Sequence, residues 1–264
     1  MRLTKHMKRA SLVGAFFVSV VSHLQAWALC PAETNVQQVA VATVVDGDTL
    51  RLVDGRSVRL IGLNATETAH KGRKAEPFSQ AAKARLQALV SKNGGRVGLR
   101  EGRQARDHYG RMLAHAFDAH GQSLEAQLLS EGLGFHVAIS PNVSMSGCLQ
   151  AVERQARRSG KGVWRQSPVI DVDRLRHGGF ALVRAHVERV DANRGGLWLE
   201  LRGPLVVQIP KDALGAFGDQ LRDMSGNDVE VRGWVVDRKG RKASARQARW
   251  LLRVTDPTML VPLP

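Results

Sequence analysis

The stretch from Val44 to Glu67 constrains the fold of this chain more than any other. It reads VVDGDTLRLVDGRSVRLIGLNATE and contains two runs of alternating apolar and polar residues, Thr49 to Val53 and Ser57 to Leu63. Such alternation predicts half-buried strands, and the Asp54-Gly55 pair between the runs is a hairpin signal. We therefore expect a fold organised around this β-hairpin.

Side chains with ligand chemistry gather on the same hairpin: Asp46, Asp48, Arg59, Asn64 and Glu67. Carboxylate and amide oxygens suit a hard cation such as calcium, and an arginine beside them suits a phosphate. Asp-Gly-Asp alone indicates no more than a surface turn, because Asp and Gly are ordinary turn residues. A later motif, Asp107-x-Tyr109-Gly110-Arg111, favours the functional interpretation.

The chain is strongly basic. Its 264 residues allow one large or two modest domains, and its formal net charge is +15. This balance predicts an anionic partner, which is nucleic acid, an anionic membrane or an acidic polymer.

Residues 1–28 have the pattern of a signal peptide. A positive start with Arg2 and Lys5 precedes a short apolar run, Leu12 to Val21, and Ala26-Trp27-Ala28 fits a cleavage site. An uncleaved anchor is the alternative, but the run is short for a bilayer. Removal takes away four basic groups and leaves 15 − 4 = +11. We expect an exported protein, periplasmic or secreted, with no stable membrane insertion after cleavage.

The sequence contains two cysteines, Cys30 and Cys148. Export places them where disulfides persist, so the prediction is one bridge from the mature N-terminus to the loop before the helix at Leu149. Two unpaired thiols are the alternative, and the spacing matches no metal site.

The remaining pattern to residue 164 mixes strands and helices. The expected strands are Val36–Val45, Val97–Arg100 and Met112–Phe117, a charged loop covers Glu101–Arg111, and the expected helices start at Pro77, Leu124 and Leu149.

From about Val39 to Trp164, roughly half the chain, the sequence resembles the staphylococcal nuclease (thermonuclease) family. The matching motifs, in the family's order, are Asp46-Gly47-Asp48-Thr49, Arg59-Leu60 to Glu67, Asp107-x-Tyr109-Gly110-Arg111 and a closing helix with Gly162-Val163-Trp164. The resemblance implies an OB-type five-stranded barrel with three helices, so the fold class is mainly β with helices. It also implies calcium-dependent hydrolysis of DNA and RNA phosphodiesters.

The resemblance also implies roles for individual residues. The metal contacts fall on Asp48, Asn64 and the main-chain carbonyl of Ala65, with Asp46 behind them. Glu67 would orient or deprotonate the attacking water. Arg59 and Arg111 would clamp the phosphate, and the Tyr109 ring would lie against the nucleotide.

Three positions depart from the family pattern. Asn64 stands where the family has an aspartate, so one ligand charge is lost and metal affinity should fall. The segment Phe135 to Ser140 has none of the tyrosines that line the family's base pocket, and Tyr109 is the only tyrosine in the chain. Thr66 replaces a proline, which should only loosen a turn.

Residues 167–264 lie beyond this resemblance, so the expected domains are 29–166 and 167–264. The C-terminal pattern of three strands, a helix over Lys211–Arg222 and two strands resembles a second, smaller OB-fold. Alternation puts Trp198 and Trp234 on polar strand faces, and Arg238 to Lys242 is a basic turn. OB-folds stack single-stranded bases on such rings. Packing of both tryptophans against the first domain, and an ordinary solvated turn, are the alternatives.

The sequence therefore predicts a monomeric calcium-dependent nuclease of DNA, RNA or both, with single strands favoured. The first alternative is a catalytically weakened module that only binds nucleic acid, for which Asn64 is the support. The second is a surface protein that binds acidic polysaccharide, which leaves the acid and amide cluster unexplained.

Overall fold

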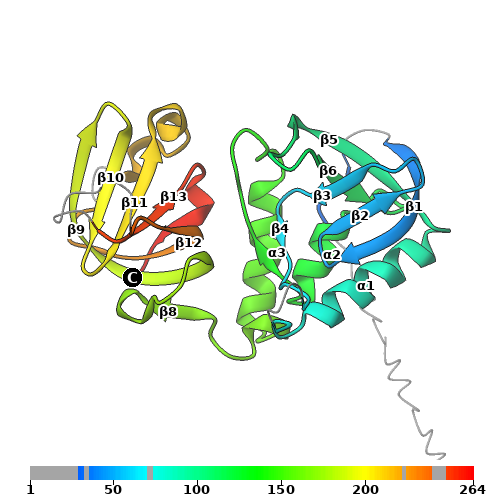
Figure 1. Ribbon diagram of the computed structural model, residues 1–264, viewed down its shortest axis with the longest axis horizontal. Coiled ribbons are helices and arrows are strands. Elements are labelled where there is room, and N and C mark those ends of the chain that lie inside the picture. Colours follow the sequence, from blue (N-terminus) through cyan, green and yellow to red (C-terminus); the bar gives the residue numbers. More distant parts are fainter. Residues whose placement is uncertain (1–28, 33–35, 70–73, 222–223, 240–247) are drawn as a thin grey trace, which may run out of the picture.

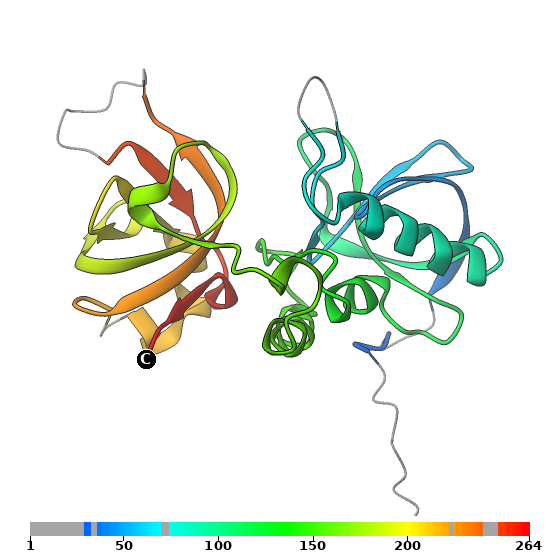
Figure 2. The ribbon, with the colours of Figure 1, turned by 90° about the horizontal axis from the view of Figure 1, so that it is seen from below.

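The computed structural model describes residues 29–32, 36–69, 74–221, 224–239 and 248–264. The predicted signal peptide lies outside these ranges, as does most of the predicted basic turn, residues 240–242. The structure is mainly β, with two closed five-stranded barrels side by side and helix α3 at their junction (Figures 1 and 2). In the described part of the chain, no helix is both long enough and apolar enough to cross a membrane.

The first barrel closes in the order β1-β2-β3-β6-β5. Its strands are β1 (Gln37–Asp46), β2 (Thr49–Leu52), β3 (Ser57–Leu60), β5 (Arg96–Arg106) and β6 (Met112–Phe117). The pairing of β3 with β6 is parallel and the other pairings are antiparallel. The predicted hairpin is present: Gly55 takes a φ of +86° in the turn between β2 and β3, where a residue without Cβ is favoured.

Three α-helices cover this barrel in the described chain: α1 (Ser79–Lys92), α2 (Leu124–Ser130) and α3 (Ser146–Arg158). The hydroxyl of Ser123 accepts a hydrogen bond from the Ala126 amide and caps α2, as its sequence predicts. Fully buried leucines such as Leu86, Leu128 and Leu149 join all three helices to the barrel core. Figure 1 shows α1 and α2 against the first barrel and α3 facing the second.

The predicted strand from Ser57 to Leu63 is interrupted. It turns at Gly62, whose φ is +83°, and continues as the two-residue strand β4 (Leu63–Asn64). Strand β4 leaves the barrel and pairs with β7 (Phe135–His136), so that Asn64 lies opposite Phe135. Ile61 and Leu63, on either side of the glycine, are both buried. The sequence pattern therefore continues across Gly62 and gives no sign of the break in the strand.

The charged segment after Arg100 also differs from the prediction. Strand β5 continues to Arg106, so only the end of the expected loop is irregular. All of residues 101–106 except Gly102 are exposed. Only Glu101 and Arg106 of this stretch pair with β6, and between them Gln104 is held by hydrogen bonds with the Asn142 side chain.

The second barrel repeats the pairing scheme of the first. Its strands are β9 (Gly179–Asn193), β10 (Gly196–Leu201), β11 (Leu205–Pro210), β12 (Asp228–Asp237) and β13 (Trp250–Arg253). The parallel pair is β11 with β13, and β12 pairs with β9 to close the barrel. This is the first barrel's order, with β9, β10, β11, β13 and β12 in the places of β1, β2, β3, β6 and β5.

Short elements complete the second barrel. Strands β8 (Val169–Asp171) and β14 (Leu260–Pro262) extend its sheet at the edges. The helix expected over residues 211–222 consists of two 3-10 segments, η3 (Lys211–Ala216) and η4 (Gly218–Leu221). Gly218, the first residue of η4, takes a φ of +53°, which an uninterrupted α-helix does not allow. The other 3-10 segments are η1 (Gly162–Trp164), η2 (Val172–Arg174) and η5 (Pro257–Met259).

A disulfide joins Cys30 to Cys148, which is the predicted pairing, but Cys148 lies within α3 and not in a loop before it, because α3 starts at Ser146. It ties the chain ahead of β1 to helix α3, across a sequence separation of 118. Cys30 is buried in the core of the first barrel, so the bridge fixes the start of the described chain to the side of α3.

Candidate active site

The turn between β1 and β2 places two carboxylates at one end of the first barrel. The Asp48 amide donates a hydrogen bond of 3.0 Å to Asp46 Oδ1, which fixes the turn. Gly47 is required by close packing, because a Cβ there would lie 2.6 Å from the Ala65 Cβ and 2.7 Å from the Ala82 Cβ. The turn is therefore pressed against the loop that follows β4, and Asp48 is buried beneath it.

Asp48 is the centre of a polar cluster. Its Oδ2 accepts a hydrogen bond of 2.8 Å from the Ala65 amide and pairs with the Arg59 guanidinium, while Oδ1 accepts a bond from the Thr49 hydroxyl. Burial raises the pKa of Asp48 to about 7, against the opposing charge of Arg59, and the neighbouring carboxylate of Asp46 adds to the rise. An added positive charge beside Asp48 would favour the ionised form of its carboxyl group.

Arg59 connects the two sides of the hairpin. Its Nη1 donates to the Leu63 carbonyl at 3.0 Å, and its Nη2 donates to Asn64 Oδ1 at 3.1 Å. Since Nη1 also pairs with Asp48, three separate segments converge on one guanidinium: the β1–β2 turn, strand β3 and strand β4. The sequence-predicted group of Asp46, Asp48, Arg59, Asn64 and Ala65 is thus assembled in one place.

The second predicted arginine stands at the start of β6. In the parallel β3–β6 pair, Arg59 lies opposite Leu113, two residues beyond Arg111. Asp107 holds Arg111 through an ion pair of 2.7 Å and accepts a hydrogen bond from its amide. Burial would raise the pKa of Asp107, but its bonds with Arg111 hold that pKa below its usual value. The Tyr109 ring is 73% exposed, with the Arg111 guanidinium 5.4 Å from its centroid.

Comparisons with known proteins agree with this arrangement. Residues 57–166 match the family model described as "Staphylococcal nuclease homologue". This part of the chain is therefore similar to the staphylococcal nucleases, and we call the first barrel with its three helices the nuclease domain. The match starts at Ser57, so the Asp46-Gly47-Asp48 turn lies outside it, although β1 and β2 complete the barrel of the nuclease domain.

Two curated relatives are similar over this region. Endonuclease YhcR of Bacillus subtilis (strain 168) is 26% identical over 169 residues, which is 58% of this chain and 14% of that protein. Thermonuclease of Staphylococcus intermedius is 28% identical over 127 residues, 47% of this chain and 74% of that protein. The chain thus spans about one seventh of the first relative and three quarters of the second.

Glu67 follows the cluster on the exposed side of the nuclease domain. Its amide donates to Glu76 Oε2 at 2.9 Å, and its carbonyl accepts from the Glu76 amide, so its backbone is fixed. Among the residues that the structure describes, its carboxylate makes no hydrogen bond or ion pair. The side chain that the sequence assigns to water activation is therefore open to solvent.

The oxygen donors of the nuclease domain suit a hard cation. In the described chain, no three side chains of the His, Cys, Asp and Glu type are grouped to hold a metal. The donors that do converge are the Asp48 carboxylate and the Asn64 amide oxygen, both at the Arg59 guanidinium, with the main chain of Ala65 bonded to Asp48. The Asp48 and Asn64 oxygens are of the kind that calcium accepts, so the donor chemistry fits the predicted ion. In this structure Arg59 holds both oxygens, and Ala65 contacts Asp48 through its amide and not its carbonyl.

The two predicted tryptophans of the second barrel lie far from each other. Trp234 on β12 is opposite Phe180, and Trp198 on β10 is opposite Asp191; these two partners stand near opposite ends of β9. Trp234 is 40% exposed and packs edge-on against Phe180 at 5.2 Å. Trp198 is half-buried beside an Arg189–Asp191 ion pair. Any base stacking at these rings would occur at two separate places.

The structure also shows polar residues that the sequence reading missed. Glu153 and Arg232 are buried and joined by an ion pair of 2.6 Å between α3 and β12. A signal was present in the sequence: Glu153 falls between Leu149 and Ala156 on the apolar stripe of α3, where a carboxylate needs a buried partner.

Proposed function

We propose that this chain is an exported nuclease that hydrolyses phosphodiester bonds in nucleic acid with calcium as its cofactor. One observation carries the proposal: Asp48, Arg59 and Asn64 converge from three segments inside the nuclease domain. The chemistry of that group, oxygen donors beside a guanidinium, is what a phosphodiester and its counterion require. The names of both relatives, an endonuclease and a thermonuclease, support the same reaction.

In the proposed reaction, water attacks the phosphorus atom and the bond to one ester oxygen breaks. The exposed Glu67 carboxylate takes the proton from that water, and the ester oxygen leaves with the electron pair. Negative charge grows on the equatorial phosphate oxygens, and Arg59 and Arg111 donate hydrogen bonds to them. Such a donor contributes on the order of 3 kcal/mol to the transition state where its removal has been measured.

Calcium would be held by Asp48, Asn64 and the Ala65 carbonyl, with Asp46 behind them, and when bound it supplies positive charge to the phosphate. Asn64 keeps an oxygen ligand but brings no charge, so we propose that this nuclease needs more calcium than one with aspartate at that place.

The proposed substrate is DNA, RNA or both, with single strands favoured. The net charge of +15 attracts a polyanion, and the exposed Tyr109 ring beside Arg111 offers a face for a base. Trp198 and Trp234 are proposed as further contacts for a long strand. The Cys30–Cys148 disulfide is compatible with export to the periplasm or medium, and we propose that the protein acts there as a monomer.

The decisive experiment uses the purified chain from residue 29 with single- and double-stranded DNA and with RNA, in calcium or in chelator. Release of acid-soluble nucleotides in calcium, and none in chelator, is the expected result. Binding without release would identify the weakened binding module. Binding of acidic polysaccharide in preference to nucleic acid would overturn the proposal.

A further inference from the structure

The segment from Phe135 to Ser140 lies between the two barrels. On one side β7 pairs with β4, with Leu63 opposite His136 and Asn64 opposite Phe135, and the Val137 amide donates to the Gly62 carbonyl. On the other side the Phe135 ring packs 5.5 Å from Phe180 of β9. We call residues 135–140 the junction segment.

The main-chain amides of the junction segment are divided between the two barrels. The Ala138 amide donates to the Met259 sulfur at 3.2 Å, and the Ser140 amide donates to the Thr255 hydroxyl at 3.0 Å. Val137 and Ala138 are buried in the core of the second barrel. A strand that pairs with the nuclease site is therefore also part of the second barrel's packing.

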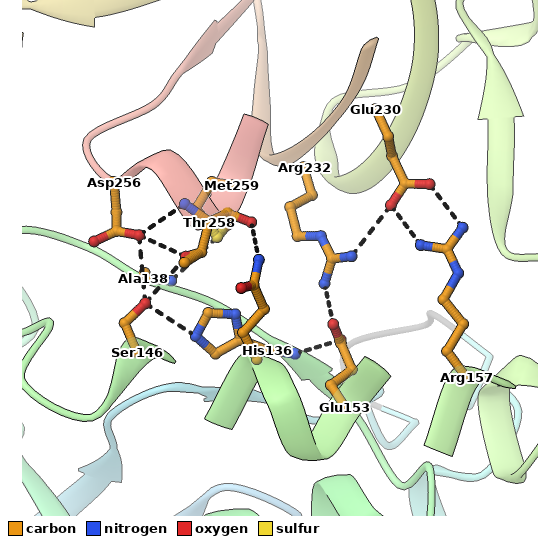
Figure 3. Close-up of polar contacts among 11 residues, drawn as sticks. His136, Ala138, Ser146, Glu153, Arg157, Glu230, Arg232, Asp256, Thr258 and Met259 are labelled. Carbon is orange, nitrogen blue, oxygen red and sulfur yellow. Dashed lines mark hydrogen bonds and ion pairs between the residues drawn. The ribbon is translucent and has the colours of Figure 1, made fainter. Parts of the chain in front are cut away.

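A buried carboxylate holds the middle of this segment. The His136 amide donates a hydrogen bond of 2.7 Å to Glu153 Oε1, and Glu153 Oε2 pairs with Arg232 Nη1 at 2.6 Å (Figure 3). Burial raises the pKa of Glu153 and the charge of Arg232 opposes that rise. Arg232 is thus the group of the second barrel that opposes protonation of this buried acceptor and pairs with it.

The contacts continue to the candidate active site. Glu153 holds β7, and β7 holds β4 by backbone pairing. Strand β4 in turn supplies two of the three acceptors of Arg59, the Leu63 carbonyl and Asn64 Oδ1, and the third is Asp48. Each link is a hydrogen bond or ion pair. Strand β4 has two residues and no other strand partner in the described chain, so its position depends on β7.

We propose that the second barrel positions the nuclease site, and that Arg232 is a positioning residue that acts through Glu153 and β7 on Asn64 and Arg59. The effect on catalysis rests on the proposed function, whereas the structural coupling between Arg232 and strand β4 does not. The second barrel thereby sets the calcium requirement and the turnover of the first. In this chain the junction segment, which lacks the family's tyrosines, serves as the connection between the barrels.

A matched pair of variants tests the proposal. Arg232→Met removes the charge that holds Glu153. Arg157→Met removes the other ion pair between α3 and β12, Arg157 with Glu230 at 2.8 and 2.7 Å (Figure 3). Glu230 also accepts a hydrogen bond of 3.1 Å from Arg232, but neither Arg157 nor Glu230 is bonded to β7. Both variants should lower the melting temperature. Only Arg232→Met should speed hydrogen exchange at Leu63, Asn64 and His136, by at least ~10-fold, measured well below the melting temperature.

Activity gives a second readout. Arg232→Met should raise the calcium concentration for half-maximal cleavage and lower kcat by ~10- to 100-fold, the scale of a 1 Å displacement of reacting groups. The double variant Arg232→Met, Glu153→Gln should recover part of both, because the glutamine oxygen still accepts from the His136 amide and no unpaired charge is buried. Arg157→Met should keep the wild-type calcium requirement.

The proposal is overturned if Arg232→Met and Arg157→Met have equal hydrogen-exchange rates at β4 and β7 and equal calcium requirements. The interface would then serve stability alone. If Arg232→Met does not fold, a comparison of Glu153→Leu with Glu153→Gln tests the same coupling, since only leucine removes the acceptor of the His136 amide. If the wild-type protein cleaves nothing, the proposed function fails, while the exchange measurement still decides the coupling.

Discussion

Asn64 and Arg59 are joined by a hydrogen bond of 3.1 Å from Arg59 Nη2 to Asn64 Oδ1. The amide oxygen of Asn64 is thereby aimed at the same guanidinium that pairs with Asp48. A carboxylate at position 64 would keep this geometry and add a negative charge beside Asp48, which would raise the affinity of the site for a dication.

The first prediction follows directly. Asn64→Asp should lower the calcium concentration needed for half-maximal cleavage, measured by calcium titration at fixed substrate. Asn193→Asp is the control, because it adds the same charge on an exposed residue of the second barrel. An unchanged or higher requirement in Asn64→Asp would show that residue 64 is not a ligand.

The second prediction concerns Glu67 and Arg111. If Glu67 accepts the proton of the attacking water and Arg111 stabilises the phosphate charge, Glu67→Gln and Arg111→Ala should each lower kcat by about 10²–10⁴-fold. Arg56→Ala serves as the control, since Arg56 is an exposed hairpin residue paired with Asp54. Near-wild-type turnover in either test variant would remove the mechanism proposed here.

The barrels follow from the sequence because alternation and turn signals are local. The Asp54-Gly55 hairpin, the capped helix after Ser123 and the β-rich C-terminal pattern are all present. What local pattern does not encode is the path of β4. The break at Gly62 depends on pairing with β7, which is more than 70 residues away in sequence.

The interface between the barrels was likewise beyond the sequence reading. Arg157 lies off the apolar stripe of α3 that Leu149 and Ala156 form, where periodicity predicts a solvent-facing side chain, yet it forms an ion pair with Glu230 of β12. A residue that faces away from the core of its own domain can face the other domain once the two barrels pack together. The partner of such a residue is therefore set by the packing of the barrels and not by local periodicity. The same reason explains why Glu153 and Arg232 were missed.

The third prediction concerns the disulfide. Unreduced, unfolded protein should label no thiol, because Cys30 and Cys148 are bonded. Reduction should lower the free energy of unfolding by roughly 2–5 kcal/mol, since the bridge closes a long loop of the unfolded chain. Denaturant titration with and without reductant measures the change, and using one sequence avoids the cost of substituting buried Cys30. Full labelling without reductant would contradict the bridge.

The fourth prediction separates the two tryptophans of the second barrel. If each stacks a base, Trp198→Ala and Trp234→Ala should each weaken binding of a 30-nucleotide single strand by about 1–3 kcal/mol. Fluorescence anisotropy in chelator measures affinity without cleavage. Because the rings lie on separate parts of the barrel, the two losses should add. A lower melting temperature with unchanged affinity would instead assign either ring to packing, which for Trp234 means its contact with Phe180.

The last prediction is a pH dependence of stability set by His136. Burial, together with the charge of Arg232, lowers the pKa of this imidazole to about 3. Around the ring, Ser146 Oγ lies 3.4 Å from Nε2 and also donates to Asp256, while Glu153 accepts from the His136 amide. The folded protein therefore keeps His136 neutral, whereas the unfolded chain protonates it near its ordinary value of 6.5.

The sign follows from the number of protons bound. Between pH 6.5 and 3 the unfolded chain binds the proton and the folded protein does not, so stability is fully present above 6.5 and is lost as pH falls. From pH 7.5 to pH 5 this one group should cost about 2 kcal/mol. His136→Gln, neutral at every pH, should lose that part of the slope, with exposed His120→Gln as the substitution control. Denaturant titrations at both pH values measure the difference; an equal slope in His136→Gln and wild type would mean that His136 binds protons alike in the folded and the unfolded protein.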